Sequence, residues 1–352
     1  MKDTVFFVLK GNNGATYICN VKSWATLNHS LKFYKARTSR AKFLKFGLQV
    51  LLFVKGKLRL QALKTSNTVE TYIQTIVKNK VGFNIDTRCS ILISPTNDKV
   101  IVNHHNEYFQ KFAFGKSYNN VKKESKIYNL FNKPIENFQI STYCDTHDTM
   151  DEMISFKLYN KHISNATGAL TKEDLVPVLL EFFIISNQRN VTVKEYASSL
   201  QSKLQQSQHL QIESLLLTLE KIKTEFGELE FPLGLVHRDF KPWNIMSYSK
   251  PLIFDFEETI MDGIPLEDLL NFNIDPIIRY KTFEEILGLS LNVSKVIIYK
   301  NYLRKLNIGV NFDVFLHFYL MERFVFYSEI NNIELSNKYL DLSTYLNDKK
   351  WV

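Results

Sequence analysis

Three side chains that carry oxygen atoms lie within Leu235–Glu257, at a spacing that could place them in one site. The sequence of this stretch is LVHRDFKPWNIMSYSKPLIFDFE. Asp239 is followed five residues later by Asn244, and an apolar run after a short polar turn leads into Asp255. Because Mg²⁺ prefers carboxylate and carbonyl oxygens, Asn244 and Asp255 suit a magnesium site beside nucleotide phosphates. A neighbouring carboxylate can accept or orient the proton of an attacking hydroxyl, which suits Asp239. The residue types and their spacing therefore indicate phosphoryl transfer.

The strings HRDFKPWN and IFDFE resemble the protein-kinase-like superfamily, and in particular its aminoglycoside phosphotransferase and choline kinase branch. That branch usually begins the catalytic loop with HGD, whereas this chain has HRD, as protein kinases do. Lys241 also matches the lysine that Ser/Thr protein kinases carry two residues after the catalytic Asp. The resemblance implies ATP and Mg²⁺ as cofactors, catalytic roles for Asp239 and Lys241, and nucleotide and metal binding by Asn244 and Asp255.

The segment after Asp255 departs from the protein kinases. Its motif is DFE where protein kinases have DFG, and no APE follows. The downstream string GIPLEDL (263–269) instead resembles phosphotransferase-like proteins of bacterial surface-polysaccharide synthesis, which implies a sugar or glycan acceptor. Asp268 lies where this string enters a predicted helix, and we expect it to cap that helix rather than to brace the catalytic loop.

A second pair of charged residues lies upstream. Lys111 falls in a predicted strand, YFQKFAF, and Glu124 falls in the helix predicted after it. The pair resembles the family's lysine that holds the α- and β-phosphates and the acid that orients this lysine. The turn between the two preceding strands, SPTND, has no glycine, so Ser94, Thr96 and Asn97 are the candidates for covering the phosphates.

We predict an α+β, bilobal protein-kinase-like fold, with a small antiparallel-sheet N-lobe, a helical C-lobe and an additional N-terminal α/β segment. The expected divisions are a basic amino-terminal segment or cap over residues 1–87, an N-lobe over 88–158 and a helical C-lobe with the catalytic loop over 159–352. The N-lobe strands are expected at 89–94, 99–102, 108–114, 138–144 and 154–159. Helices are expected at 172–187, 192–206, 212–226, 281–289, 294–306 and 312–330.

The formal net charge of +8 is unevenly distributed, because Asp3 is the only acid before residue 68. A helix is predicted from Ser39, with Phe43, Phe46 and Val50 on one side. We expect this side to dock onto its own domain; the alternative is peripheral contact of the basic residues 1–67 with an anionic membrane, which would suit a lipid-linked glycan acceptor. The chain lacks a secretory signal and a long apolar span, so we expect a cytoplasmic protein, with peripheral contact at the inner membrane face as that alternative.

Three other functions remain open. HRDFKP favours a Ser/Thr protein kinase, which the missing GxGxxG, activation loop and APE disfavour. An aminoglycoside-type phosphotransferase is the second, although no strongly acidic acceptor region is evident. The third is a non-catalytic scaffold of a glycan-assembly complex, which the full set of reactive residues disfavours. The sequence disfavours nucleic-acid binding, because no zinc-finger, RRM or helix-turn-helix signature accompanies the basic charge.

Overall fold

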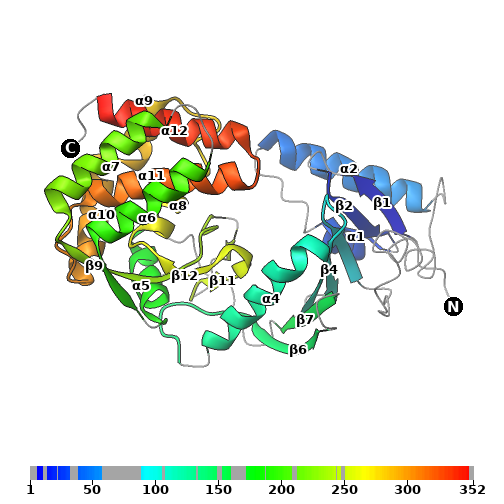
Figure 1. Ribbon diagram of the computed structural model, residues 1–352. Coiled ribbons are helices and arrows are strands. Elements are labelled where there is room, and N and C mark those ends of the chain that lie inside the picture. The colour runs from blue at the N-terminus through cyan, green and yellow to red at the C-terminus, as the bar shows by residue number, and fades with distance from the viewer. Residues whose placement is uncertain are drawn as a thin grey trace. The chain divides into compact units, whose positions relative to one another are not determined.

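The computed structural model of the 352-residue chain describes residues 6–10, 14–21, 23–31, 39–57, 89–104, 108–131, 134–148, 153–159, 172–186, 188–207, 212–242, 244–246 and 250–348 (Figure 1). Much of the predicted basic segment, including residues 58–88, lies outside these ranges. The chain divides into two compact units. Unit 1 is Met1–Tyr128 with Ser141–Ile163, and unit 2 is Asn129–Ile140 with Ser164–Val352.

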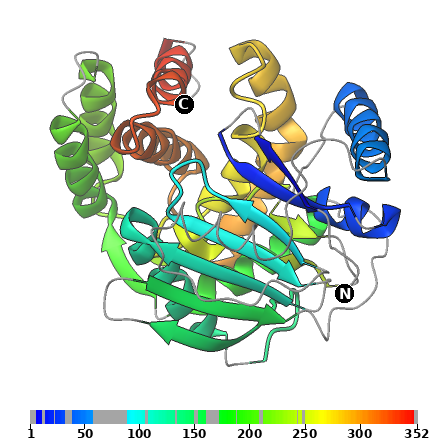
Figure 2. The same cartoon turned by 90° about the vertical axis from the view of Figure 1, so that its right-hand side faces the viewer.

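In the described part of unit 1, seven antiparallel strands form one sheet in the order β1-β2-β3-β4-β5-β7-β6 (Figure 2). Their bounds are β1 Phe6–Lys10, β2 Thr16–Asn20, β3 Cys89–Ile93, β4 Lys99–His104, β5 Tyr108–Phe114, β6 Thr142–Asp148 and β7 Met153–Tyr159. In β4 the buried Val100 and Val102 alternate with the half-buried Lys99 and Ile101. The first two strands therefore extend the same sheet that carries Lys111.

The helix α4 (Gly115–Leu130) follows β5 directly and packs on this sheet. Tyr128 stacks on Tyr143 of β6 and touches Phe156 of β7. The same buried face of the helix carries Val121 and Glu124. Packing of α4 therefore fixes where the Glu124 carboxylate lies relative to β5.

The predicted N-lobe strand at 138–144 is wrong in its placement. Strand β6 begins at Thr142 and continues to Asp148, because its backbone pairs with β7 from Tyr159 to Ile154. Gln139 instead forms an isolated bridge with Leu252 in unit 2. Residues 138–140 therefore belong to unit 2, through a long-range pairing that local alternation does not reveal.

The described part of unit 1 also contains the short helix α1 (Trp24–Ser30) and the long helix α2 (Ser39–Lys57). The helix α2 docks, but not through its predicted side. Leu48, Leu52 and Phe53 pack on a cluster formed with residues of β1, β2 and α1, whereas Phe43 and Phe46 are 76% and 56% exposed. The predicted docking stripe was wrong because the apolar residues run around most of the helix, so spacing alone does not select the inner face.

Unit 2 is mainly helical. The helices are α5 Lys172–Ile184, α6 Val193–Gln206, α7 Glu213–Phe226, α8 Glu267–Ile274, α9 Phe283–Ser290, α10 Val293–Lys305, α11 Phe312–Glu329 and α12 Ile333–Asp348. The helix α11 is buried along almost its whole length and packs against α6, α8, α10 and α12 (Figure 1). It therefore forms the centre of this unit.

A small sheet in unit 2 leads into the predicted catalytic loop. Its strands are β8 Arg189–Thr192, β9 Glu230–Val236 and β12 Ile260–Gly263, in the order β12-β9-β8. Gly234 of β9 pairs with Gly263 of β12. A Cβ on Gly234 would lie 2.6 Å from the carbonyl oxygen of Phe183 in α5. The glycine therefore permits the close approach of β9 to α5, just before the loop begins.

The predicted α+β class, with an antiparallel sheet in the first part and a helical second part, is confirmed by these two units. Among the described residues, no helix is both long and apolar enough to span a lipid bilayer.

Candidate active site

In unit 1, Lys111 and Glu124 form a buried ion pair. Lys111 Nζ lies 2.9 Å from both carboxylate oxygens of Glu124, and the two side chains are 7% and 0% exposed. Lys111 occupies the middle of β5, paired with Ile101 in β4 and Phe156 in β7. The pairing of β5 with β4 and β7 places Lys111, and the packing of α4 on the sheet places Glu124 beside it.

In unit 2, the catalytic loop begins where β9 ends at Val236. Arg238 has a positive φ of 61°, which turns the chain sharply before Asp239. The carboxylate of Asp268, in the first turn of α8, accepts the backbone N–H groups of His237 at 2.7 Å and Arg238 at 2.9 Å. Asp268 therefore braces the loop. Our expectation that it caps α8 was wrong, because the cap position is Leu266, which makes no side-chain bond.

Asp239 is held by the two predicted residues nearest to it. Asn244 Nδ2 donates to Asp239 Oδ2 at 2.6 Å and to its backbone carbonyl at 2.9 Å. Lys241 Nζ lies 2.5 Å from Asp239 Oδ1. Since Asn244 uses its amide N–H groups on Asp239, its Oδ1 is the atom that suits a cation. Both oxygens of Asp239 are therefore oriented by side chains of the same loop.

A short hairpin, whose strands have two residues each, brings the segment of Asp255 next to the segment of Asn244. Strand β10 (Ile245–Met246) pairs with β11 (Leu252–Ile253), and Phe254 N donates to Asn244 O at 3.3 Å. Asp255 follows in the left-handed conformation, with φ 72° and ψ 63°. A non-glycine residue adopts this conformation at some energetic cost, so a backbone held there is often functional.

The imidazole of His237 lies between the two parts of the loop. It is fully buried, and Nε2 lies 3.1 Å from the carbonyl oxygen of Phe254. Burial lowers the pKa of His237, and the nearby carboxylates of Asp239 and Asp255 only partly oppose this effect. A neutral histidine thus links the Asp239 segment to the Asp255 segment, which is the role of a brace.

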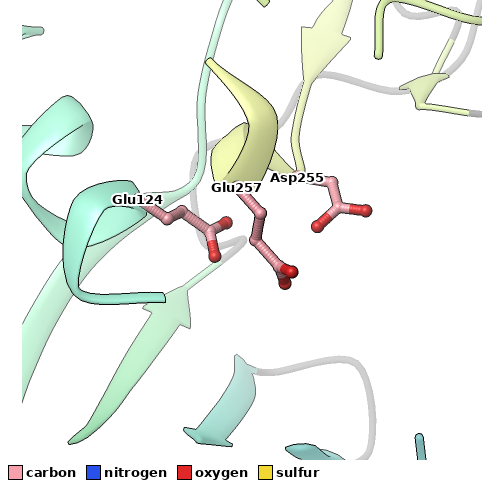
Figure 3. A group of neighbouring side chains, drawn as sticks. All are labelled: Glu124, Asp255 and Glu257. Carbon is pink, nitrogen blue, oxygen red and sulfur yellow. The ribbon is translucent and has the colours of Figure 1, made fainter. Parts of the chain in front are cut away.

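Glu257 is a candidate that the sequence analysis did not assign. It lies in the short 3₁₀ helix η2 (Phe256–Glu258), and a carboxylate oxygen of Glu257 lies within 4.8 Å of one of Asp255. Figure 3 shows both side chains extending from this segment, and Glu124 extending from α4. Two carboxylates at this separation form a donor set that fits a hard divalent cation. The D-x-E spacing was the available signal.

The remaining candidates, Ser94, Thr96 and Asn97, form a tight turn between β3 and β4. The hydroxyls of Ser94 and Thr96 donate to the carboxylate of Asp98, and Asn97 has a φ of 58°. Lys111, Glu124 and this turn belong to unit 1, whereas Asp239, Lys241, Asn244 and Asp255 belong to unit 2.

Comparison with known proteins agrees with the loop chemistry. Residues 186–273 match the family model described as Phosphotransferase enzyme family. This stretch runs from the end of α5 through the catalytic loop to α8 and contains four of the predicted site residues. The match confirms the resemblance inferred from the motif, and with it the expected enzyme class of a phosphotransferase. No curated protein matches the chain.

Several solved structures are similar at low identity. One is a GDP complex of a mutant aminoglycoside 2'-phosphotransferase IIIa, at 14% identity and TM-score 0.46, covering 82% of this chain and 99% of that chain. Another is a thermostable mutant of aminoglycoside phosphotransferase APH(4)-Ia with AMP-PNP and hygromycin B, at 14% identity and TM-score 0.49, covering 79% and 97%. Both TM-scores lie below 0.5, so the assignment rests on the family match and the loop geometry.

Proposed function

We propose that this protein is a Mg²⁺-dependent kinase that transfers the γ-phosphoryl group of ATP to a hydroxyl group of a small molecule. One observation carries the proposal. Asp239 is fixed by Asn244 and Lys241 at the end of the hairpin that delivers Asp255. The transferred group passes through a loose transition state, so a protein that positions groups and neutralises charge supplies most of the catalysis.

Each residue of the loop has a role in this reaction. Asp239 accepts or orients the proton of the acceptor hydroxyl as its oxygen forms a bond to phosphorus and ADP leaves. Lys241 neutralises charge on the moving phosphoryl group. Asn244 and Asp255 would hold Mg²⁺, which would neutralise charge on the nucleotide phosphates, and Glu257 is a further candidate ligand.

Lys111 has a role on the nucleotide side. An ammonium group placed over the α- and β-phosphates must keep one rotamer, and its 2.9 Å contacts with both oxygens of Glu124 supply that restraint. Lys111 therefore binds the phosphates in this proposal, and Glu124 orients Lys111.

We further propose that the acceptor is a sugar or a glycan end in bacterial surface-polysaccharide synthesis. The support is the resemblance of the segment from DFE to GIPLEDL (255–269) to phosphotransferase-like proteins of that process.

The test is ADP release and product mass with Mg²⁺–ATP and a panel of sugars, nucleotide-sugars, glycan oligomers, aminoglycosides and a generic protein. Transfer to a sugar or glycan is expected. Asp239→Asn should lower kcat by about 10³-fold or more, because it removes the group that positions the hydroxyl. Glu225→Gln, on the exposed face of α7, is the control and should keep full activity. Transfer to protein alone, or activity that survives Asp239→Asn, would contradict the proposal.

The surface of α2 supports a peripheral membrane contact for this enzyme. Six large apolar residues of the helix are at least 40% exposed: Phe43, Leu44, Phe46, Val50, Leu51 and Val54. The sequence of α2 contains lysines and an arginine but no acid. Apolar side chains with basic residues around them are the composition of a helix that lies on an anionic lipid surface.

Vesicle sedimentation tests this contact. The full chain should bind phosphatidylglycerol vesicles, weakly at high salt, and should not bind phosphatidylcholine vesicles. Phe43→Ser with Leu44→Ser should reduce binding about tenfold or more, because two apolar side chains no longer enter the lipid. Val293→Ser with Ile297→Ser, at two exposed positions of α10, is the matched control. Equal binding by both double variants would remove the membrane contact and leave the proposed reaction intact.

A further inference from the structure

A buried arginine lies behind the catalytic loop. Arg323, in the middle of α11, has a side chain that is 1% exposed. Its guanidinium donates to the backbone carbonyl of Arg238 at 3.0 Å and to Asp275 Oδ1 at 3.2 Å. Asn271 Nδ2 also donates to the carbonyl of Arg238, at 2.6 Å. The residue before Asp239 is thus held by two side chains from the centre of unit 2.

The carboxylate of Asp275, at the end of α8, gathers four donors. Besides Arg323, Oδ1 accepts the hydroxyls of Tyr327 at 2.6 Å and Tyr339 at 2.8 Å. Oδ2 lies 2.8 Å from Lys241 Nζ. The Asp275 side chain is only 7% exposed, so these four donors, and not water, fix the position of its carboxylate.

Lys241 connects this carboxylate with the loop. Its Nζ lies 2.8 Å from Asp275 and 2.5 Å from Asp239, and its side chain is 11% exposed. A lysine has a flexible four-carbon stem, so a second buried carboxylate is an effective way to fix where its charge lies. Burial lowers the pKa of Lys241, but Asp275 and Asp239 outweigh this effect, and the net pKa is raised.

We propose that Asp275 is a positioning residue for phosphoryl transfer, which holds the Lys241 ammonium against Asp239 and is itself held by Arg323. The inference rests on the proposed function. Asp275 does not touch the reacting atoms; it determines where the charge of Lys241 stands when the phosphoryl group moves. The alternative is that Asp275 belongs to a buried ion pair that only stabilises the fold, so the test needs measurements that a structural role would leave unchanged.

The main variant is Asp275→Asn, which keeps the side-chain shape and an oxygen for the tyrosine hydroxyls. We expect kcat to fall about tenfold or more while KM for ATP changes less than about twofold, because in this proposal the charge of Lys241 acts on the moving phosphoryl group in the transition state and not on bound ATP. The alkaline limb of the kcat–pH profile should also move to lower pH, because a carboxylate that raises the pKa of Lys241 is gone. Tyr327→Phe, which removes one donor to Asp275, should change kcat in the same direction but less.

The control is Tyr299→Phe, which removes a buried hydrogen bond to Ser290 O at 2.8 Å and affects none of the four side chains that bind Asp275. It should lower stability without changing kcat or its pH profile. If Asp275→Asn is folded and keeps the wild-type kcat and alkaline limb, the inference is wrong while the proposed function stands. If the wild type transfers no phosphate, the proposed function fails.

A measurement independent of activity tests the placement of Lys241 directly. Acylation of Lys241 by an amine-reactive ester, followed at alkaline pH by peptide mass spectrometry, should be faster in Asp275→Asn than in the wild type. Only the unprotonated amine reacts with the ester. In the variant, Lys241 should be held less tightly, and a larger fraction of its amine should be unprotonated. Equal acylation rates would overturn the inference whatever the activity.

Discussion

At the scale of single residues, the carboxylate of Asp239 is shared between two partners of different character. Lys241 brings a positive charge to Oδ1, and Asn244 brings a neutral donor to Oδ2. The chain spacing of the three residues was apparent in the sequence. Their mutual orientation was not, because it depends on a turn at Arg238 with positive φ and on Asp268, which lies thirty residues away.

Lys111 and Glu124 give a prediction about buried charge. Lys111→Met leaves the buried Glu124 carboxylate without its lysine, so the free energy of unfolding should fall by about 3 kcal/mol. Adding Glu124→Leu should recover most of that loss while activity stays absent. Urea denaturation of the two single variants and the double variant measures this. Lys281→Met, in an exposed pair with Glu285, is the control and should leave stability almost unchanged.

A coupling energy near zero between Lys111 and Glu124 would contradict this account of the pair. The sequence indicated the pairing only by resemblance, since a lysine in a strand and a glutamate in the next helix are common. The burial of both groups, which makes the pair energetically important, follows from the packing of α4 on the sheet.

Asp275 gives a prediction about acid stability. Burial alone would raise its pKa, but Arg323 and Lys241 lower the pKa to about 2. The ordinary value for an Asp is 3.8, so the unfolded chain takes up a proton at higher pH than the folded chain. Asp275 therefore stabilises the fold at pH above about 4, and this contribution is lost as the pH falls towards 2.

The size of the effect should be about 2 kcal/mol. Denaturation of the wild type and of Asp275→Asn at pH 6 and pH 3 measures the difference between their free energies of unfolding. This difference should be large at pH 6 and smaller at pH 3. A difference that is the same at both pH values would show that the carboxylate charge does not contribute.

At the scale of elements, the hairpin of β10 and β11 positions the metal-binding candidates although each strand has only two residues. The sequence indicated β11 because an apolar run precedes Asp255. It did not indicate the bridge from Gln139 to Leu252, with Gln139 N donating to Pro251 O at 2.8 Å, that supports the hairpin from a distant segment. Contacts of long sequence separation leave no local pattern, which is also why strand β6 was misplaced.

The approach of β9 to α5 gives an element-level prediction. Gly234→Ala places a Cβ 2.6 Å from the carbonyl oxygen of Phe183, so the backbone must shift and stability should fall by about 1 to 3 kcal/mol. The catalytic loop follows three residues later, so kcat should fall too. Gly288→Ala in α9 is the matched control, because nothing lies within 4 Å of its Cβ; it should stabilise the chain by up to about 1 kcal/mol.

Thermal denaturation and steady-state kinetics of the two alanine variants check this. If Gly234→Ala were as stable and active as Gly288→Ala, the close approach would not be a constraint on the loop.

At the scale of the whole molecule, the sequence predicted the fold class because strand-rich and helix-rich patterns occupy separate parts of the chain. It also predicted most helix positions in unit 2, where capping boxes at Thr192 and Thr282 mark two starts. It failed on which side of α2 is buried, because that depends on the apolar surface of β1, β2 and α1. Local sequence patterns thus predict where the helices and strands lie, whereas tertiary packing determines which side of each is buried.

The central claim is that the loop from Asp239 to Asp255 forms a magnesium–nucleotide site. Calorimetric titration with AMP-PNP, in the presence and absence of Mg²⁺, tests it most directly. Mg²⁺ should strengthen binding about tenfold or more in the wild type and in the surface control Asp341→Asn, but hardly at all in Asp255→Asn. If the affinity of the wild type for AMP-PNP were the same with and without Mg²⁺, or if Asp255→Asn kept the full Mg²⁺ dependence, the account would be contradicted.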